Sequence, residues 1–154
     1  MLKLTKKADY GLIAMRHLAV APRAAASTKE ISDAYGIPLS LLSKVMQTLT
    51  KAGLLQSIAG TNGGYKLARD PRAISALEII RSLDGPVILT SCFTSHGECD
   101  QSEKCTVREP LRQVHEAILG LFGKMTVAEL SRDDRRQTPI CSSPVPESHP
   151  LLVL

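Results

Sequence analysis

Apolar residues recur at helical spacing in the first part of the chain. After Thr5 they fall at successive steps of four, three and four residues, which places them on one face of an amphipathic helix. These positions are Ala8, Leu12, Met15 and Ala19. We expect this first helix to end near Ala21-Pro22.

Two further helices, joined by a tight turn, are predicted next. Ser27 and Glu30 have the spacing of a capping box, which indicates a helix start, and Gly36 suits a C-cap. After Ile37-Pro38, apolar residues repeat at i, i+3, i+4 and i+7. They are Leu42, Val45, Met46 and Leu49. The pattern predicts a helix-turn-helix, whose second helix lies in the major groove when such a motif binds DNA.

Residues 53–69 predict a β-hairpin. Two loosely alternating segments, 53–59 and 65–69, flank a turn at 60–64 that contains the Asn-Gly pair favoured in hairpins. A helix-turn-helix followed directly by a β-hairpin is a winged helix, and a glycine-rich wing tip can approach a phosphate backbone closely. A further helix is predicted up to Asp84-Gly85-Pro86. It is expected to contain Ile74, Leu77, Ile80 and Arg81.

The C-terminal part contains a pattern typical of paired helices. Its apolar residues are spaced four, three, four, three and four, as in the a and d positions of a coiled coil. They are Val107, Leu111, Val114, Ile118, Leu121 and Met125. The pattern predicts a homodimer through this helix; intramolecular packing is the alternative. Capping-box spacings at Thr106/Glu109 and Thr126/Glu129 predict the start of this helix and of a short final one.

Together these elements predict a mainly α fold with a small β-hairpin wing, a winged helix-turn-helix followed by a long dimerisation helix. The expected divisions are a DNA-binding domain at 1–84, a cysteine loop at 85–106, the dimerisation and final helices at 107–131, and a disordered tail at 132–154. No segment approaches the roughly 20 apolar residues of a membrane span, and the N-terminus lacks a signal-peptide core. We therefore expect a cytoplasmic protein without a membrane partner.

Charge is distributed unevenly along the chain. Residues 1–70 carry ten Lys and Arg against four Asp and Glu, a net +6, whereas residues 71–154 carry nine against eleven, a net −2. The basic half is predicted to bind double-stranded DNA, although a solvated basic face is the alternative. Base edges are expected to contact Ser40, Ser43 and Gln47, and phosphates to contact Lys44, Lys51, Lys66 and Arg69. Thr28 and Asn62 are further candidate DNA contacts.

Three of the four cysteines fall within fourteen residues, at Cys92, Cys99 and Cys105. In a reducing compartment, clustered thiols favour a metal or redox site, with an iron-sulfur cluster, Zn or Cu(I) as the metal. A zinc-binding structural or thiol-redox protein, with His96 completing the site, is therefore the alternative function. Cys141 is expected to be a bystander. No phosphate loop, nucleophile elbow or paired catalytic motif is present in the sequence, so we do not expect an enzyme.

Several of these motifs together resemble the Rrf2 family of bacterial winged-helix transcription regulators. The resemblance covers residues 1 to about 130 and is carried by short motifs along that length. They are Leu4-Thr5 through Asp9-Tyr10, Ile37-Pro38, Lys44-Val45, Leu49, Lys51-Ala52-Gly53-Leu54, Gly63-Gly64-Tyr65-Lys66-Leu67-Ala68-Arg69 and Asp84-Gly85-Pro86. The resemblance implies a dimeric DNA-binding repressor with a 2Fe-2S or 4Fe-4S cluster, whose occupancy or oxidation state changes promoter affinity.

Three thiolates leave such a cluster one protein ligand short. The family's iron-sulfur biogenesis regulators place a His three positions after the third cysteine, where this chain has Arg108. Its nitric-oxide-sensing members use an Asp near the N-terminus of the partner subunit, and Asp9 stands at the matching position. The resemblance therefore favours Asp9 as the fourth ligand. The alternatives are His96, Glu98, Cys141 and an exogenous ligand.

The position of the three cysteines directly before the predicted dimer helix motivates a hypothesis for how a cluster is coupled to DNA binding. A cluster shared with Asp9 of the partner subunit would tie the first helix of one subunit to the dimer helix of the other. Its loss would alter the spacing of the two recognition helices and their fit to an operator. Several family members carry Arg just before the wing glycine, where this chain has Ala59, so their operator sequence is not expected to transfer.

Overall fold

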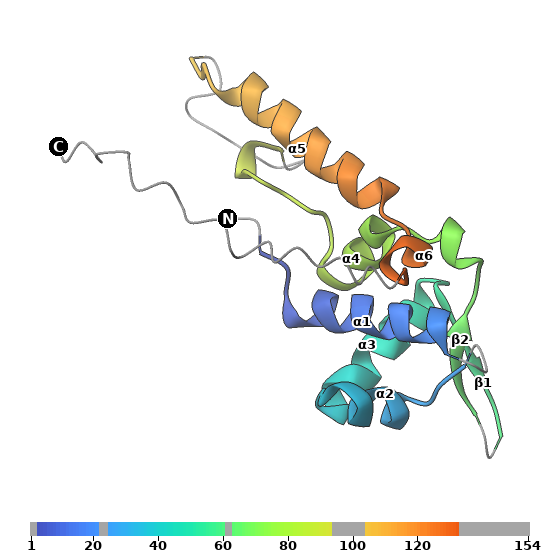
Figure 1. Ribbon diagram of the computed structural model, residues 1–154. Helices are drawn as coiled ribbons and strands as arrows, with labels where there is room; N and C mark the ends of the chain where they lie inside the picture. The colour runs from blue at the N-terminus through green and yellow to red at the C-terminus, as the bar shows by residue number, and fades with distance from the viewer. Residues whose placement is uncertain (1–2, 22–24, 61–62, 94–103, 133–154) are drawn as a thin grey trace, which may run out of the picture.

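The computed structural model describes residues 3–21, 25–60, 63–93 and 104–132 (Figure 1). Within them the chain is mostly helical, with one antiparallel hairpin, which confirms the predicted mainly α class with a β wing. The elements are α1 (Lys6–Val20), α2 (Thr28–Tyr35), α3 (Leu39–Lys51), β1 (Leu55–Ile58), β2 (Gly64–Leu67), the 3-10 turn η1 (Pro71–Ala73), α4 (Ala76–Asp84), the 3-10 turn η2 (Ser91–Phe93), α5 (Arg108–Lys124) and α6 (Val127–Leu130).

Helix α1 begins where the Thr5 hydroxyl accepts hydrogen bonds from the backbone of Lys7 and Ala8. Its buried face is rotated from the predicted one, because Leu12 and Ala19 are only half-buried. The fully buried positions are Ala8, Gly11, Ala14, Met15 and Leu18. The rotation has a packing cause: α4 lies so close to α1 that a Cβ at position 11 would overlap the side chain of Leu83.

The helix-turn-helix follows its sequence signals closely. Ser27 and Glu30 form the predicted capping box, and Gly36 ends α2 in the left-handed conformation with φ 63°. Helix α3 then begins after Pro38. Its four predicted apolar positions are all buried: Leu42, Val45, Met46 and Leu49. These residues join α1 and α2 in one core, which fixes the opposite face of α3 toward solvent.

The wing is a two-stranded hairpin that is anchored to the start of α2. Leu55 pairs with Leu67, and Ile58 pairs with Gly64, so both strands are shorter than the predicted segments. Tyr65 extends the pairing by exchanging backbone hydrogen bonds of 2.9 and 3.1 Å with Ala26. A Cβ at Gly64 would stand 2.5 Å from the Ala26 carbonyl oxygen, so this contact requires glycine. The hairpin therefore has a fixed position beside the helix-turn-helix.

The chain after the long helix returns to the winged-helix core. The backbone N–H of Ala76 donates to the Met125 carbonyl at 2.7 Å, and the N–H of Val127 donates to the Ile74 carbonyl at 2.9 Å. Val127 is fully buried in the core, and Arg16 of α1 donates to the Leu130 carbonyl at 2.9 Å. The predicted capping box at Thr126 is confirmed. The C-terminal end of α5 is thus fixed to the body of the protein.

Two predicted helix starts are wrong. Ile74 lies before α4, which instead begins with an unpredicted capping box formed by Ser75 and Glu78. The proposed box at Thr106 does not form, because α5 begins at Arg108 without a side-chain cap. Pro110 occupies its first turn, where the missing N–H costs no intrahelical hydrogen bond.

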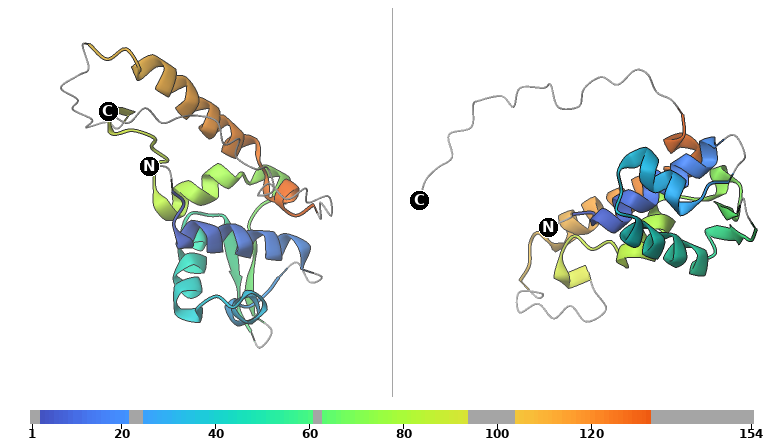
Figure 2. Two further views of the ribbon diagram at one scale, coloured as in Figure 1. Left: turned by 60° about the vertical axis from the view of Figure 1, so that its left-hand side comes forward. Right: turned by 90° about the horizontal axis from the view of Figure 1, so that it is seen from below.

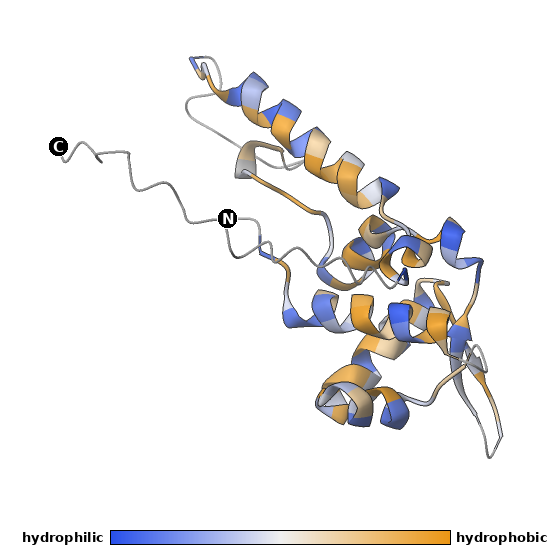
Figure 3. Ribbon diagram, viewed as in Figure 1, coloured by the Kyte–Doolittle hydropathy of each residue, from blue (hydrophilic) through white to orange (hydrophobic). Residues whose placement is uncertain are grey.

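Helix α5 extends away from the other helices, and its C-terminal end lies nearest α4 (Figures 1 and 2). None of its side chains, all within the described part of the chain, is fully buried. Apolar residues nevertheless recur along its length (Figure 3). Among residues 3–21, 25–60, 63–93 and 104–132, no helix combines the length and apolar character needed to cross a membrane.

Candidate DNA interface and cysteine site

The outer face of α3 carries most of the predicted DNA contacts. Its exposed members are Ser40, Lys44, Gln47 and Lys51. Ser43 differs, because it is half-buried and its hydroxyl donates a 2.8 Å hydrogen bond to the Leu39 carbonyl. The Ser43 O–H therefore points to the helix backbone, and only the lone pairs of its oxygen can accept a hydrogen bond from a base edge. The helix presents two lysines and two uncharged hydrogen-bonding groups on one exposed surface.

The wing offers one exposed cation and one that is already paired. Lys66 lies exposed on β2. Arg69 donates a 2.8 Å hydrogen bond to Glu78 and a 3.4 Å one to the Ala73 carbonyl. The Arg69 hydrogen bond lowers the pKa of Glu78 below its ordinary value. Arg69 therefore joins the wing to α4, and a DNA phosphate would have to compete with Glu78 for it.

A shallow hollow of about 240 Å³ lies between α3 and the wing. Its lining residues are Gln47, Thr50, Lys51, Ser57 and Tyr65. Ser57 and Tyr65 were not predicted to belong to the interface, because their proximity to α3 depends on how the hairpin packs. Of the remaining predicted contacts, Thr28 is the half-buried first residue of α2, and Asn62 lies outside the described residues. The surface is continuous from the recognition helix to the wing.

The cysteine site is only partly within the described chain. Cys92 lies in η2, partly buried, with its sulfur 3.0 Å from the Thr90 hydroxyl oxygen. Cys105 is also partly buried and precedes α5 by three positions. Both thiols are free. The other predicted or alternative ligands in this region, Cys99, His96 and Glu98, lie outside the described residues, as does Cys141.

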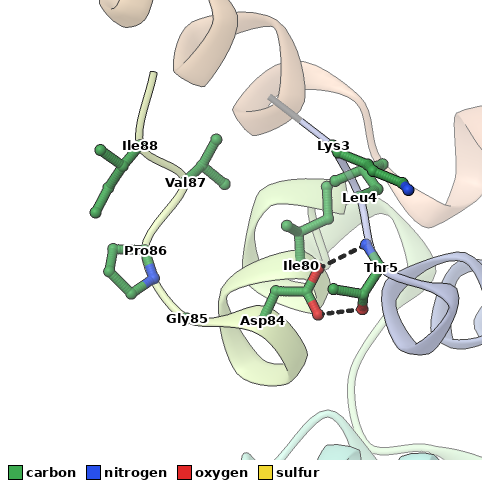
Figure 4. Close-up of a pocket in the computed structure, with 9 residues that line it drawn as sticks. All are labelled: Lys3, Leu4, Thr5, Ile80, Asp84, Gly85, Pro86, Val87 and Ile88. Atoms are coloured by element: carbon green, nitrogen blue, oxygen red, sulfur yellow. Dashed lines mark hydrogen bonds between the residues drawn. The ribbon is translucent and has the colours of Figure 1, made fainter. Parts of the chain in front are cut away.

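Asp9 lies exposed in the first turn of α1, on a helix start that is connected to the end of α4. The backbone N–H of Thr5 donates to Asp84 at 3.1 Å, and the Thr5 hydroxyl donates to the same carboxylate (Figure 4). A pocket of about 210 Å³ opens beside this contact, lined partly by Pro86 and Ile88 from the segment that leads to Cys92. The start of α1 and the approach to the cysteine loop are therefore neighbours.

A second contact connects the cysteine segment to α5. The rings of Phe93 and His115 lie with their centroids 5.2 Å apart and their planes inclined by 32°. Because Phe93 follows Cys92 directly, this contact places the first cysteine beside the long helix. Twenty-two positions separate the two rings, so no local sequence pattern indicates their pairing. A 270 Å³ pocket between α4 and α5 lies against the same rings.

The donor chemistry of the three cysteines fits an iron-sulfur cluster, for which thiolate is the usual protein ligand. Among residues 3–21, 25–60, 63–93 and 104–132, however, no three His, Cys, Asp or Glu side chains gather closely enough to hold a metal ion. Cys92 and Cys105 would hold the group together with Cys99. The fourth position stays open, with Asp9 of a partner subunit, His96, Glu98, Cys141 and an exogenous ligand as the candidates.

A helix-turn-helix with a wing and an exposed basic recognition helix defines a winged-helix DNA-binding protein. Comparison with known proteins identifies the family. The Rrf2 family, described as iron-dependent transcriptional regulators, matches residues 4–133, and the chain belongs to it. The chain is 32% identical over 139 residues to the regulator NsrR of Shouchella clausii, covering 88% of this chain and 93% of that protein. It is also 32% identical over 130 residues to IscR of Escherichia coli, covering 84% and 80%.

Solved structures support the same assignment. CymR, described as the global cysteine regulator of B. subtilis, superposes with a TM-score of 0.74 at 32% identity, covering 85% of this chain and 97% of that one. IscR of T. potens superposes with a TM-score of 0.68 at 30% identity, covering 86% and 88%. The sequence-based prediction of family and winged-helix fold is thus confirmed.

Proposed function

We propose that this protein is a homodimeric repressor that binds operator DNA and senses iron-sulfur status, nitric oxide or redox state. The observation that carries the proposal is the presence of Cys92, Cys99 and Cys105 between α4 and α5 in a chain whose family is described as iron-dependent. Thiolates are the expected ligands for an iron-sulfur cluster, and a cluster that is exposed to small oxidants suits a sensor.

DNA binding is proposed to use α3 and the wing of each subunit. Lys44, Lys51 and Lys66 are exposed and would neutralise phosphates, whereas Ser40 and Gln47 are exposed and can hydrogen-bond to base edges. Double-stranded promoter DNA is the proposed partner. In a dimer, two such surfaces would contact half-sites about one helical turn apart.

Dimerisation is proposed to use the apolar stripe of α5. The stripe includes the residues that flank α5 at both ends: Val107, Val114, Leu121 and Met125 are 55%, 48%, 68% and 41% exposed in the single chain, and Leu111 and Ile118 are half-buried. A row of exposed apolar side chains at a and d spacing is stabilised when a second helix covers it. The intramolecular alternative is not favoured, because α5 buries no side chain completely against the described part of its own chain.

The proposed ligands are Cys92, Cys99 and Cys105 of one subunit and Asp9 of the partner subunit. When bound, the cluster would supply a redox-sensitive link between the subunits. The protein's own contacts would carry the signal onward: Phe93 and His115 join the cysteine segment to α5, and Thr5 and Asp84 hold the α1 start that carries Asp9. A change at the cysteines would then alter the spacing of the two α3 helices.

Anaerobic purification followed by metal analysis tests this proposal. The expected protein is brown, absorbs in the visible range and contains iron and acid-labile sulfide. Asp9→Ala should change that spectrum, whereas Asp33→Ala, at an exposed position of α2, should leave it unchanged. An unchanged Asp9→Ala spectrum would shift the fourth ligand to His96, Glu98 or another donor. Colourless protein with one Zn per chain would contradict the cluster and support the zinc-binding alternative.

A second candidate is a regulator whose cysteines act as thiols without a cluster. The similarity to CymR, a cysteine regulator by its description, favours this candidate. Metal-free protein whose operator affinity changes with thiol oxidation, and returns on reduction, would support it. The cluster proposal instead requires iron for the same change in affinity.

A further inference from the structure

Leu39 is an apolar residue that is largely exposed, so packing in the core does not explain why it is apolar. It is the first residue of α3 and is 48% exposed, although Ile37 before it and Leu42 after it are buried. Single exposed leucines are common on protein surfaces. This one, however, stands at the N-terminal end of the recognition helix, which is the part of such a helix that contacts base edges.

The hydrogen-bonding groups around Leu39 restrict what this end of the helix can recognise. The Ser43 hydroxyl donates to the Leu39 carbonyl at 2.8 Å, so that donor is used within the helix. Ser40 keeps an exposed hydroxyl, and Lys44 lies one turn further along. The first turn therefore offers one hydroxyl and one apolar surface to whatever faces it.

Thymine is the only base of DNA that presents an apolar group in the major groove, namely its 5-methyl group. We propose that Leu39 contacts a thymine methyl group in each half-site and thereby determines specificity at that base pair. The proposal rests on the proposed DNA-binding function and adds an apolar contact to the proposed hydrogen-bonding ones. Burial of one methyl group corresponds to about a fourfold change in affinity.

Deoxyuridine lacks the thymine methyl group and keeps every hydrogen-bonding group, so it isolates the contact. The probe is a duplex selected from random sequences by the wild-type protein, with each thymine of one half-site replaced singly by deoxyuridine. We expect one replacement to weaken binding by about fourfold. Leu39→Ala should weaken binding to the thymine duplex by a similar factor and lose the difference between the two duplexes.

Two control variants make the result specific. Leu39→Met keeps an apolar side chain and should keep the preference for thymine. Asp33→Ala, at an exposed position of α2, should keep it too. Because no charge is removed, Leu39→Ala should also leave the salt dependence of binding unchanged. Thermal unfolding of each variant confirms that the fold is retained.

Equal affinity of the wild-type protein for thymine and deoxyuridine at every position would overturn the inference, as would a Leu39→Ala variant that still distinguishes them. In both cases the protein still binds DNA, so the proposed function stands. A Leu39→Ala variant that binds normally but fails to repress would assign Leu39 to a protein contact instead. Failure of the wild-type protein to select any DNA would overturn the proposed function and this inference together.

Discussion

The Thr5 hydroxyl donates a hydrogen bond of 2.5 Å to the Asp84 carboxylate and so connects the start of α1 to the end of α4. The backbone N–H of Thr5 donates to the other carboxylate oxygen at 3.1 Å. The same hydroxyl accepts from the first turn of α1, which makes Thr5 both a helix cap and a tertiary contact. The first turn of α1, which carries Asp9, is therefore held against the end of α4, from which the chain continues to the cysteine loop.

Asp84→Ala should destabilise the protein, because both hydrogen bonds from Thr5 are lost. We expect the free energy of unfolding to fall by about 1–2 kcal/mol in urea denaturation. Asp33→Ala is the control, since Asp33 is also an exposed carboxylate but lies on α2, and its effect should stay within about 0.5 kcal/mol. Equal effects of the two substitutions would show that the Thr5 contact contributes nothing.

Substitution of the apolar stripe of α5 should separate the subunits. Val114→Asp and Leu121→Asp each place a charge in the proposed dimer interface, where it would be desolvated without a partner. Sedimentation should show monomers at concentrations where the wild-type protein is a dimer. Gln113→Asp, beside Val114 on the exposed surface, should remain dimeric. Dimers that persist in both stripe variants would place the interface elsewhere.

Operator binding should depend on salt in proportion to the phosphates neutralised. Lys44→Ala, Lys51→Ala and Lys66→Ala should each reduce the slope of log affinity against log salt by about 0.9. Arg69→Ala should reduce it less, because its guanidinium is bound to Glu78. Lys124→Ala, at the end of α5, serves as the control and should leave the slope unchanged. If all five variants showed the wild-type slope, none of the substituted side chains would neutralise a phosphate.

The pairing of Arg69 with Glu78 should make stability depend on acidic pH. The Arg69 hydrogen bond lowers the folded-state pKa of Glu78 from its ordinary 4.5. Its stabilising contribution is therefore fully present above that value and is lost as pH falls through the lowered pKa. Glu78→Gln should cost up to about 1 kcal/mol at neutral pH, since the pair is exposed, and progressively less below pH 4.5.

A double-mutant cycle attributes that effect to the pair. In an Arg69→Ala background, Glu78→Gln should cost less than in the wild-type protein at neutral pH, because the lost interaction is already absent. A loss of stability that is the same in both backgrounds would assign the role of Glu78 to the capping box with Ser75, whose hydrogen bonds also lower the Glu78 pKa.

Local signals explain why much of the fold could be predicted from the sequence. The capping box at Ser27, the left-handed Gly36 and the buried stripe of α3 depend on residues within a few positions of one another. The predicted start of α5 at Thr106 was wrong, because the helix begins at Arg108 without a side-chain cap and has Pro110 in its first turn.

The rest depends on contacts between distant segments. The buried face of α1 follows from the close approach of α4 at Gly11, and the pairing of Arg69 with Glu78 follows from how the wing packs. For the candidate site, the exposed face of α3 was predictable from periodicity alone. The inward hydrogen bond of Ser43 and the contact of Phe93 with His115 were not, because side-chain direction and packing leave no pattern in the sequence.

In the proposed switch, the cysteine site controls operator affinity through a cluster. The most direct measurement compares anaerobically purified, cluster-loaded protein with the same preparation after cluster removal, on one operator duplex at fixed salt. We expect different affinities for the two forms, and a shift toward the cluster-free value after treatment with nitric oxide or oxygen. Equal affinities before and after removal would contradict it.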